Sequence, residues 1–294
     1  MPSFVALRHR LSRWKILKGS DAVRVGKPNR HQFIRLEYPI FPKVRADNQT
    51  VRQLIDRNRD RYRELLAQMA ALTPYLAQIE TRTADPSEPY WTNGFIPPLD
   101  AVAIYGLLAI RNPRLFVEIG SGNSTKFARR SIRDHRLRTR IISIDPHPLT
   151  EIDRICDQVI RNPLQDIDLA LFDDLTAEDI VFCDGSHRAF QNSDVTVFFC
   201  DVLPRLATGM TVGVHDIFLP EDYPEQWLGR FYNEQYLLSC YLMGGDTLSI
   251  ELPGYYCGAD PELYGLLDGL WTQLNLPDVP YRGSAFWLRI NRRP

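Results

Sequence analysis

The chain has 294 residues and a formal net charge of −1, with 44% hydrophobic and 24% charged residues. This composition is that of a globular protein and excludes a disordered or collagen-like chain. No apolar run reaches the roughly 18 residues that span a bilayer, and the N-terminus lacks the apolar core and cleavage site of a secretory signal. We therefore expect neither a membrane span nor secretion.

Five scattered cysteines are present, an odd number without C-x-x-C spacing. This pattern favours reduced thiols in a cytoplasmic protein over a disulfide framework or a zinc site. Basic residues prevail in residues 1–140 and acidic residues in 141–294. A basic face for an anionic partner is one interpretation. We favour mutual neutralisation within one fold or a homodimer, so a nucleic-acid partner is not expected.

Residues 1–46 are basic and irregular, and the apolar residues between positions 4 and 14 would form one face of a short helix. Such a helix could contact a membrane surface or nucleic acid, but we favour an arm that packs on its own domain or on a partner subunit. Apolar residues between 51 and 72 recur at helical spacing, which predicts a helix from Asn48 or Thr50 to about Gln78. A loop over 81–99 and a helix over 100–110 follow. We expect a helical N-terminal extension over 1–88 and a second domain over 89–294.

From Leu115 the pattern changes to short apolar runs that alternate with helical segments, which predicts a doubly wound α/β fold. Strands are expected over 115–119, 141–144, 158–161, 180–183, 210–214, 248–252 and 284–290. Helices are expected over 124–134, 148–156, 192–206, 223–243 and 262–274. The two late strands would form a terminal hairpin-like edge. The predicted architecture is a Rossmann-like, seven-stranded, mostly parallel sheet.

The first strand of this part ends in a glycine loop, LFVEIGSGNST over residues 115–125. Glycines at 120 and 122 would let the backbone approach a ligand closely, and the following helix N-terminus can receive an anionic group. The dinucleotide fingerprint would place a third glycine where Thr125 stands. Glu118 would repel a pyrophosphate and attract a sulfonium cation. The loop therefore favours S-adenosylmethionine over NAD.

Asp145 ends the next strand and can accept both hydroxyls of an adenosine ribose. After the third strand, Leu164 and Gln165 stand where an adenine would lie. The predicted cofactor contacts are Glu118, Gly120, Ser121, Gly122, Asn123, Ser124, Asp145, Pro146, Leu164, Gln165 and Asp184.

Two further strand ends carry acidic and imidazole side chains: Asp184 and His187 in CDGSH, and His215 and Asp216 in VHDIF. If these strands are neighbours, all four side chains meet at one edge of the sheet. Asp184 and Asp216 could then hold a hard divalent cation, with His215 as a weaker ligand. A histidine there could also serve as general base.

The motifs FVEIGSGNST, SIDPHP, IVFCDGSH and VHDIFLP, in this order, resemble a bacterial subfamily of class I S-adenosylmethionine-dependent methyltransferases. That subfamily is related to the macrocin-type and rhamnosyl O-methyltransferases, and the resemblance covers residues 89–290. It implies that Asp184 and Asp216 bind Mg²⁺ and that His187 is the catalytic base. His215 stands where those relatives have glutamate, so Mn²⁺, Zn²⁺ and a metal-free mechanism stay open.

The expected reaction is O-methylation of a hydroxylated small molecule or sugar. Trp91, Asn93, Tyr223 and Trp227 are predicted to contact this acceptor. Three alternatives remain: an NAD-type oxidoreductase, a metal-dependent hydrolase and a non-catalytic cofactor-binding scaffold.

Overall fold

The computed structural model describes residues 47–148, 150–276 and 282–292. The chain divides into two compact units, residues 1–44 and 45–294. The predicted arm at positions 4–14 lies outside the described residues.

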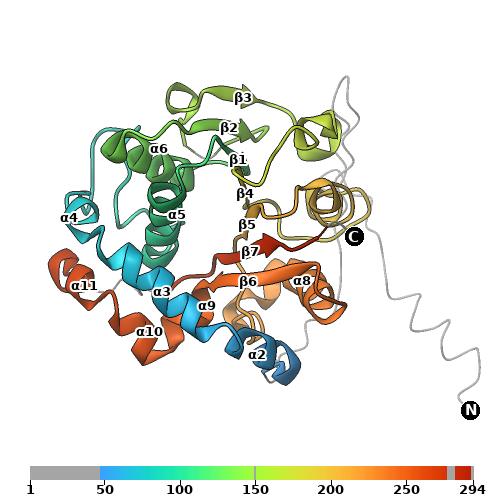
Figure 1. Ribbon diagram of the computed structural model, residues 1–294. Coiled ribbons are helices and arrows are strands. Elements are labelled where there is room, and N and C mark those ends of the chain that lie inside the picture. The colour runs from blue at the N-terminus through green and yellow to red at the C-terminus, as the bar shows by residue number, and fades with distance from the viewer. Residues whose placement is uncertain (1–46, 149, 277–281, 293–294) are drawn as a thin grey trace, which may run out of the picture. The chain divides into compact units, whose positions relative to one another are not determined.

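A seven-stranded sheet forms the centre of the second unit, in the order β3-β2-β1-β4-β5-β7-β6 (Figure 1). Its first five strands are parallel, and β7 runs antiparallel between β5 and β6. The fold class is therefore confirmed as Rossmann-like α/β. The strands are β1 Leu115–Ile119, β2 Arg140–Ile144, β3 Gln158–Ile160, β4 Ile180–Cys183, β5 Thr211–Val214, β6 Leu248–Pro253 and β7 Phe286–Ile290.

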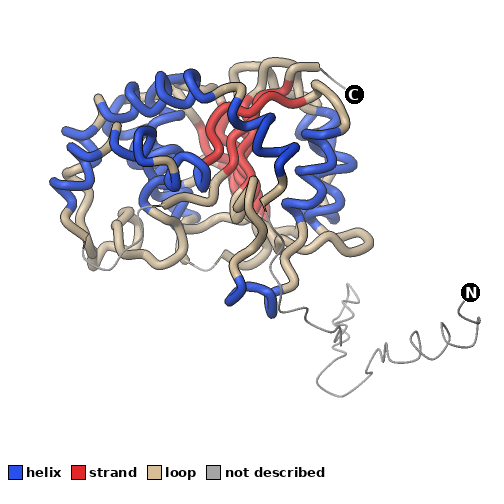
Figure 2. The backbone as a smooth tube through the Cα atoms, turned by 90° about the horizontal axis from the view of Figure 1, so that it is seen from below, coloured by secondary structure: helices blue, strands red, loops and turns tan. Residues whose placement is uncertain are grey.

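Helices cover both faces of the sheet, which is why its central strands read as continuous apolar runs. Helices α5 (Pro98–Arg111) and α6 (Asn123–His135) lie on one side of the strands, and α8 (Glu234–Met243) lies on the other (Figure 1). Seen from below, the strands form a layer between helices (Figure 2). No helix within the described ranges is both long enough and apolar enough to cross a membrane.

The prediction of one long helix over 48–78 is wrong in its continuity. The structure has three shorter helices there: α2 (Gln49–Asp56), α3 (Arg59–Ala70) and α4 (Thr73–Leu76). Asn48 caps α2 as expected, accepting from the Val51 N–H at 3.2 Å. The first break occurs where the Ile55 carbonyl accepts from the Asn58 N–H and from the Tyr62 hydroxyl. Helix α3 contacts α5 and β6, and the boundary at 88/89 stays a prediction.

Two other predicted helices differ from the structure. Among residues 148 and 150–156, which the structure describes, the helical part is limited to the 3₁₀ turn Asp153–Ile155, and the side chain of Arg129 donates to the Ile155 carbonyl there at 2.6 Å. The segment over 223–243 is a 3₁₀ turn, η6 (Glu225–Arg230), followed by α8. These are separated because Asn233 donates its N–H to the His187 carbonyl at 2.9 Å instead of to a preceding turn.

The remaining segments follow the predicted pattern with changes of helix type. Residues 194–205 form a continuous helical segment of α7 (Asp194–Val197), a π turn (Phe198–Val202) and a 3₁₀ turn (Leu203–Arg205). The C-terminal helical piece is α10 (Pro261–Gly265) and α11 (Asp268–Leu274), and α9 (Gly254–Ala259) was not expected.

Aromatic packing determines how β4, β5 and β7 lie together. The ring of Phe182 is stacked on Phe116 and Trp287, with centroids 6.4 and 5.2 Å away. A Cβ on Gly213 of β5 would lie 2.6 Å from atoms of both Phe182 and Trp287. Only glycine fits between these rings. Strands β4 and β5 pair in parallel, with Cys183 opposite Val214, so their ends are neighbours, as the site prediction required.

Candidate active site at the carboxyl ends of the strands

A cavity of about 760 Å³ lies at the carboxyl ends of the parallel strands. The strand order reverses between β1 and β4, which is where open α/β sheets bind ligands. Ten of the eleven predicted cofactor residues line this cavity: Gly120, Ser121, Gly122, Asn123, Ser124, Asp145, Pro146, Leu164, Gln165 and Asp184. The loop after β1 and the acidic end of β4 therefore share one cavity.

The two loop glycines have different roles. Gly120 has φ +78°, and a Cβ there would lie 1.8 Å from the Asp184 carbonyl oxygen. Glycine is therefore required at this position for packing against the residue that follows β4, and Gly120 also lines the cavity. A Cβ on Gly122 would meet only the Thr150 side chain, at 3.7 Å. Gly122 is thus the position where the backbone is open to a ligand.

Glu118 is fully buried behind the loop and is the one predicted cofactor residue that does not line the cavity. Its Oε2 accepts from the Thr125 hydroxyl, which in turn accepts from the Gly122 N–H at 3.0 Å. Burial raises the pKa of Glu118 to about 8, and this effect is larger than the lowering of the pKa by hydrogen bonds from Ser124 and Thr125. The carboxyl therefore supports the loop from behind, while its second oxygen, Oε1, is buried and has no hydrogen-bond partner among the described residues. The expected attraction to a sulfonium stays a prediction.

Asp145 ties the loops after β1 and β2 together. Its Oδ2 accepts from the Ser121 N–H at 2.8 Å, and its Oδ1 accepts from the His147 N–H at 2.7 Å. A carboxylate has about four acceptor positions, so both oxygens can still accept ribose hydroxyls. Asn123 lines the same cavity, and its buried Oδ1 has no hydrogen-bond partner among the described residues. An amino group of a ligand would satisfy it, so these residues fit S-adenosylmethionine.

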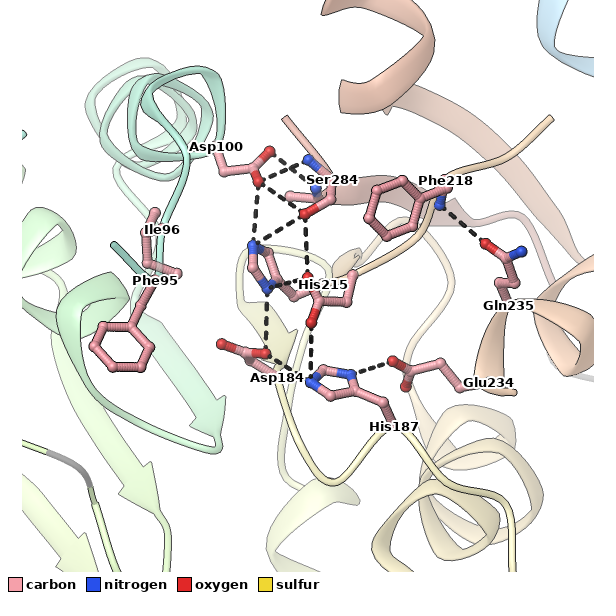
Figure 3. A network of polar contacts seen from close by, with 12 residues as sticks. Phe95, Ile96, Asp100, Asp184, His187, His215, Phe218, Glu234, Gln235 and Ser284 are labelled. Carbon is pink, nitrogen blue, oxygen red and sulfur yellow. Dashed lines mark hydrogen bonds and ion pairs between the residues drawn. The ribbon is translucent and has the colours of Figure 1, made fainter. Parts of the chain in front are cut away.

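A polar network closes the other side of the cavity (Figure 3). His187 Nε2 lies 3.3 Å from Asp184 Oδ1 and 3.4 Å from Asp216 Oδ2. His215 Nδ1 lies 3.2 Å from Asp184 Oδ1 and 3.5 Å from Asp216 Oδ1. The four residues expected at one sheet edge are thus brought together, with the two imidazoles flanking the two carboxylates.

Each imidazole is also held from behind by a buried carboxylate. His187 Nδ1 binds Glu234 of α8, and His215 Nε2 lies 3.1 Å from Asp100 of α5 (Figure 3). Asp100 also accepts from the Ser284 and Ala285 N–H groups at 2.7 and 2.8 Å. This joins α5 to the segment that leads into β7.

Asp100, Ser284 and Glu234 were not among the predicted site residues. A signal for Asp100 was present in the sequence, because it is the only charged residue between Ile96 and Ile110.

Backbone conformation at this site is unusual. His187 and Asp216 have φ values of 59° and 56°, in the left-handed region that non-glycine residues rarely adopt. Such conformations persist where the surroundings enforce them, often at functional sites. Here Asp194 accepts from the Ser186 N–H and hydroxyl at 2.6 and 2.5 Å, which holds the loop before His187.

The charges of the network shift each other's pKa values. Burial alone would lower the pKa of His187, but Glu234 and Asp184 outweigh it and raise that pKa well above its ordinary value. The pKa of His215 is raised in the same way by Asp184 and Asp216. For Asp184, burial is outweighed by the two histidines, which hold its pKa below the usual range. Burial raises the pKa of Asp216.

Asp184, His187 and Asp216 each offer one ligand atom, and these atoms all lie within 4.8 Å of one another. A histidine whose other nitrogen is held by a carboxylate is the usual arrangement at metal sites, and Glu234 supplies it here. His187 therefore joins the candidate ligand set in the place where we expected His215. The chemistry of this donor set fits a divalent transition metal such as Mn²⁺ or Zn²⁺ better than an all-oxygen Mg²⁺ site.

Of the four predicted acceptor contacts, only Trp227 lines the cavity. Trp91 is buried against Phe127, with ring centroids 5.5 Å apart. The Asn93 side chain closes a turn, accepting from the Phe95 and Ile96 N–H groups at 2.9 and 2.7 Å. Tyr223 is buried, and its hydroxyl accepts from the Gln235 N–H. Local hydrogen bonds and core packing thus occupy three of these side chains. Other residues that line the cavity are Phe95, Ile96, Arg188, Arg230 and Tyr232.

Comparison with known proteins agrees with this geometry. Residues 117–217 match the family described as "Methyltransferase domain". An uncharacterized protein from Archaeoglobus fulgidus is 29% identical over 155 residues, which cover 50% of this chain and 69% of that protein. The family match and the strand order support a class I S-adenosylmethionine-dependent methyltransferase.

Solved structures of similar fold include an SAH-bound methyltransferase from Podospora anserina, at 14% identity and a TM-score of 0.43, covering 85% of this chain and 99% of that chain. An O-methyltransferase from Bacillus cereus in complex with SAH has 15% identity and a TM-score of 0.38, covering 79% and 90%. A branched-chain polyamine synthase from Thermus thermophilus has 14% identity and a TM-score of 0.42, covering 99% and 79%.

Proposed function

We propose that the protein transfers a methyl group from S-adenosylmethionine to a hydroxyl of a small-molecule acceptor. The observation that carries this proposal is the shared cavity. The loop of Gly122 and Asn123 lines one part of it, and the network of Asp184, His187 and Asp216 lines another. A methyl donor on the loop would thus face groups that can take a proton. The motif resemblance to macrocin-type and rhamnosyl O-methyltransferases favours a sugar hydroxyl.

In this mechanism His187 is the general base. Its Nδ1 is held by Glu234, so the nitrogen that would accept the hydroxyl proton is Nε2, which lies beside Asp184 and Asp216. The acceptor oxygen forms a bond to the methyl carbon as the sulfur–methyl bond breaks, and S-adenosylhomocysteine (SAH) leaves. His187 must be neutral for this step, which requires that the negative charge of Asp184 and Asp216 be offset.

Asp184, His187 and Asp216 are the residues that would hold a divalent cation. Such an ion lowers the pKa of a bound hydroxyl and orients it. If His187 is a ligand, it cannot be the base in the same step, so these two roles are alternatives. A cation that binds Asp184 and Asp216 alone would leave His187 neutral and available.

Calorimetry with S-adenosylmethionine, SAH and NADH tests the proposal. We expect the first two to bind and NADH not to bind. Binding of NADH alone would favour an oxidoreductase, and binding of no nucleotide would favour a metal-dependent hydrolase. A His187→Ala variant that still binds SAH but has lost methyl transfer would separate an enzyme from a scaffold. Unchanged transfer by this variant would exclude the base assignment. A homodimer and a cytoplasmic location stay predictions.

A further inference from the structure

Two arginine side chains line the cavity beside the network. Arg188 follows His187 in the loop after β4, and Arg230 ends η6. The two loops are joined, because Arg188 Nε donates to the Arg230 carbonyl at 2.8 Å and Arg188 Nη1 donates to the Ser186 carbonyl at 3.2 Å. Arg188 is thereby held at the wall of the cavity.

Aromatic rings hold both guanidinium groups in place. The Cζ of Arg230 lies 3.8 Å from the ring centroid of Trp227 and 5.7 Å from that of Tyr232. The Cζ of Arg188 lies 5.1 Å from the centroid of Tyr232. Stacking occupies the face of a guanidinium and leaves N–H groups on its edge free to donate. Because the groups are already positioned, less conformational entropy is lost when they bind a ligand.

Within the described part of the chain, neither arginine makes an ion pair with a carboxylate. Arg61 and Arg111 show the contrast, since both pair with the buried Glu251 at 2.5 and 2.7 Å. Arg188 and Arg230 instead place two positive charges near one ring, that of Tyr232. Their mutual repulsion is relieved when an anion lies between them.

The same ring connects the arginines to the reacting groups. The centroid of Tyr232 lies 4.5 Å from that of His187. An anion bound by the two arginines would therefore be separated from His187, the proposed base, by about the width of the Tyr232 ring. A molecule that carries both a hydroxyl and an anionic group can reach both places.

We propose that Arg188 and Arg230 bind an oxyanion, a carboxylate or a phosphate, of the methyl acceptor. The natural acceptor is then a hydroxylated acid or a phosphorylated hydroxyl compound, and the two arginines determine this specificity. The inference rests on the proposed function, because it assumes that the second ligand in the cavity is a methyl acceptor.

Calorimetry with three sugars of one scaffold tests this: glucuronate, glucose 6-phosphate and uncharged glucose, each titrated into the free and the SAH-loaded protein. We expect at least one anionic sugar to bind about tenfold more tightly than glucose or better, as charge-assisted hydrogen bonds would provide. The carboxylate and phosphate arms show which oxyanion is preferred. Absence of any preference for an anionic sugar would overturn the proposal.

The double variant Arg188→Gln/Arg230→Gln should bind all three sugars with similar affinity and bind SAH as the wild type does. The control Arg57→Gln/Arg82→Gln changes the net charge equally at two exposed residues that do not line the cavity, and it should keep the preference. A preference that persists in the first variant would refute the proposal. So would a loss of SAH affinity there, because the arginines would then serve the cofactor.

Two further measurements keep the test decisive. Arg230→Gln changes one exposed side chain and should weaken the preference even if the double variant does not fold. If the wild type binds no SAH, the proposed function fails by itself. Titration of the free protein then still decides whether the arginines select an oxyanion.

Discussion

The two histidines of the site are positioned by the same device. Each has one ring nitrogen on a buried carboxylate, Glu234 for His187 and Asp100 for His215, and the other nitrogen on the pair Asp184 and Asp216. In each case the buried carboxylate, Glu234 or Asp100, fixes the orientation of the imidazole ring and increases its basicity. The network holds four carboxyl groups and two imidazoles, so its acidic groups outnumber its basic groups. This favours a cation or a positively charged ligand beside it.

Glu234→Gln removes the charge behind His187 and keeps the shape of the side chain. We expect methyl transfer to fall about 10–100-fold, because the ring loses its orienting carboxylate, while SAH affinity changes little. Initial rates and calorimetry on the same preparation measure the two effects. The matched control is Glu225→Gln, an exposed position on η6 that should keep the wild-type rate. Equal rates for the two variants would show that Glu234 does not act through His187.

Glu118 makes stability depend on pH. Its pKa is about 8 in the folded protein because of burial, against about 4.3 for an unperturbed glutamate. Folding therefore takes up a proton between these values. The stabilisation is fully present below the lower pKa and is lost as pH rises through the higher one, by at most about 1.4 kcal/mol per pH unit.

The variant Glu118→Gln should consequently show a smaller loss of unfolding free energy between pH 6 and pH 9 than the wild type. Urea denaturation at both pH values measures this. Exposed Glu64 provides the control, since Glu64→Gln should leave the pH dependence unchanged. A wild-type slope in the Glu118 variant would contradict the assigned pKa.

Among the elements, the contact between β1 and β4 organises the site. Through Gly120, the turn after β1 packs against the carbonyl of Asp184, the residue that directly follows β4. The loop after β4 is held in turn by α8, because Asn233 accepts from the Ala189 N–H at 2.6 Å and donates to the His187 carbonyl. The position of His187 is thus determined by two elements far apart in sequence.

Gly120→Ala tests the contact between the strands. The added Cβ would collide with the Asp184 carbonyl at a residue with positive φ, so we expect a loss of about 2–4 kcal/mol in unfolding free energy. Gly122→Ala is its counterpart, since its Cβ meets only Thr150 at 3.7 Å. This variant should keep the stability and weaken SAH binding. Chemical denaturation and calorimetry distinguish the two. Equal stability losses would argue against the different roles assigned to the glycines.

For the whole molecule, the cavity is assembled from loops that follow several different strands. Binding of SAH should therefore slow amide exchange at several separate segments, 119–124, 144–147 and 184–188, because a ligand that binds only the folded form suppresses opening there. Helices α2 and α3 contribute no residue to this cavity and serve as the internal control. Hydrogen-exchange mass spectrometry with and without SAH measures this. Protection confined to one loop would not agree with a shared cavity.

The sequence by itself determined the alternation of strands and helices, the glycine loop and the four polar residues at two strand ends. These are local patterns, since the spacing of apolar side chains and the residues after each strand depend on neighbouring positions only. The helix breaks at Asn58 and before α8 were not predicted. At the first break the Ile55 carbonyl accepts from the Asn58 N–H and the Tyr62 hydroxyl, and before α8 the Asn233 N–H donates to the His187 carbonyl in a distant loop.

Only the tertiary structure decided which side chains face the cavity. Glu118 lies behind the loop, and Trp91, Asn93 and Tyr223 are used in packing and turns. Asp100 is 115 residues from His215 in the chain but lies 3.1 Å from it in the fold. Such long-range pairs follow from the sheet order and the packing of helices on it, which no local pattern encodes. The chemistry of the site was therefore readable from the sequence, but the partners that orient it were not.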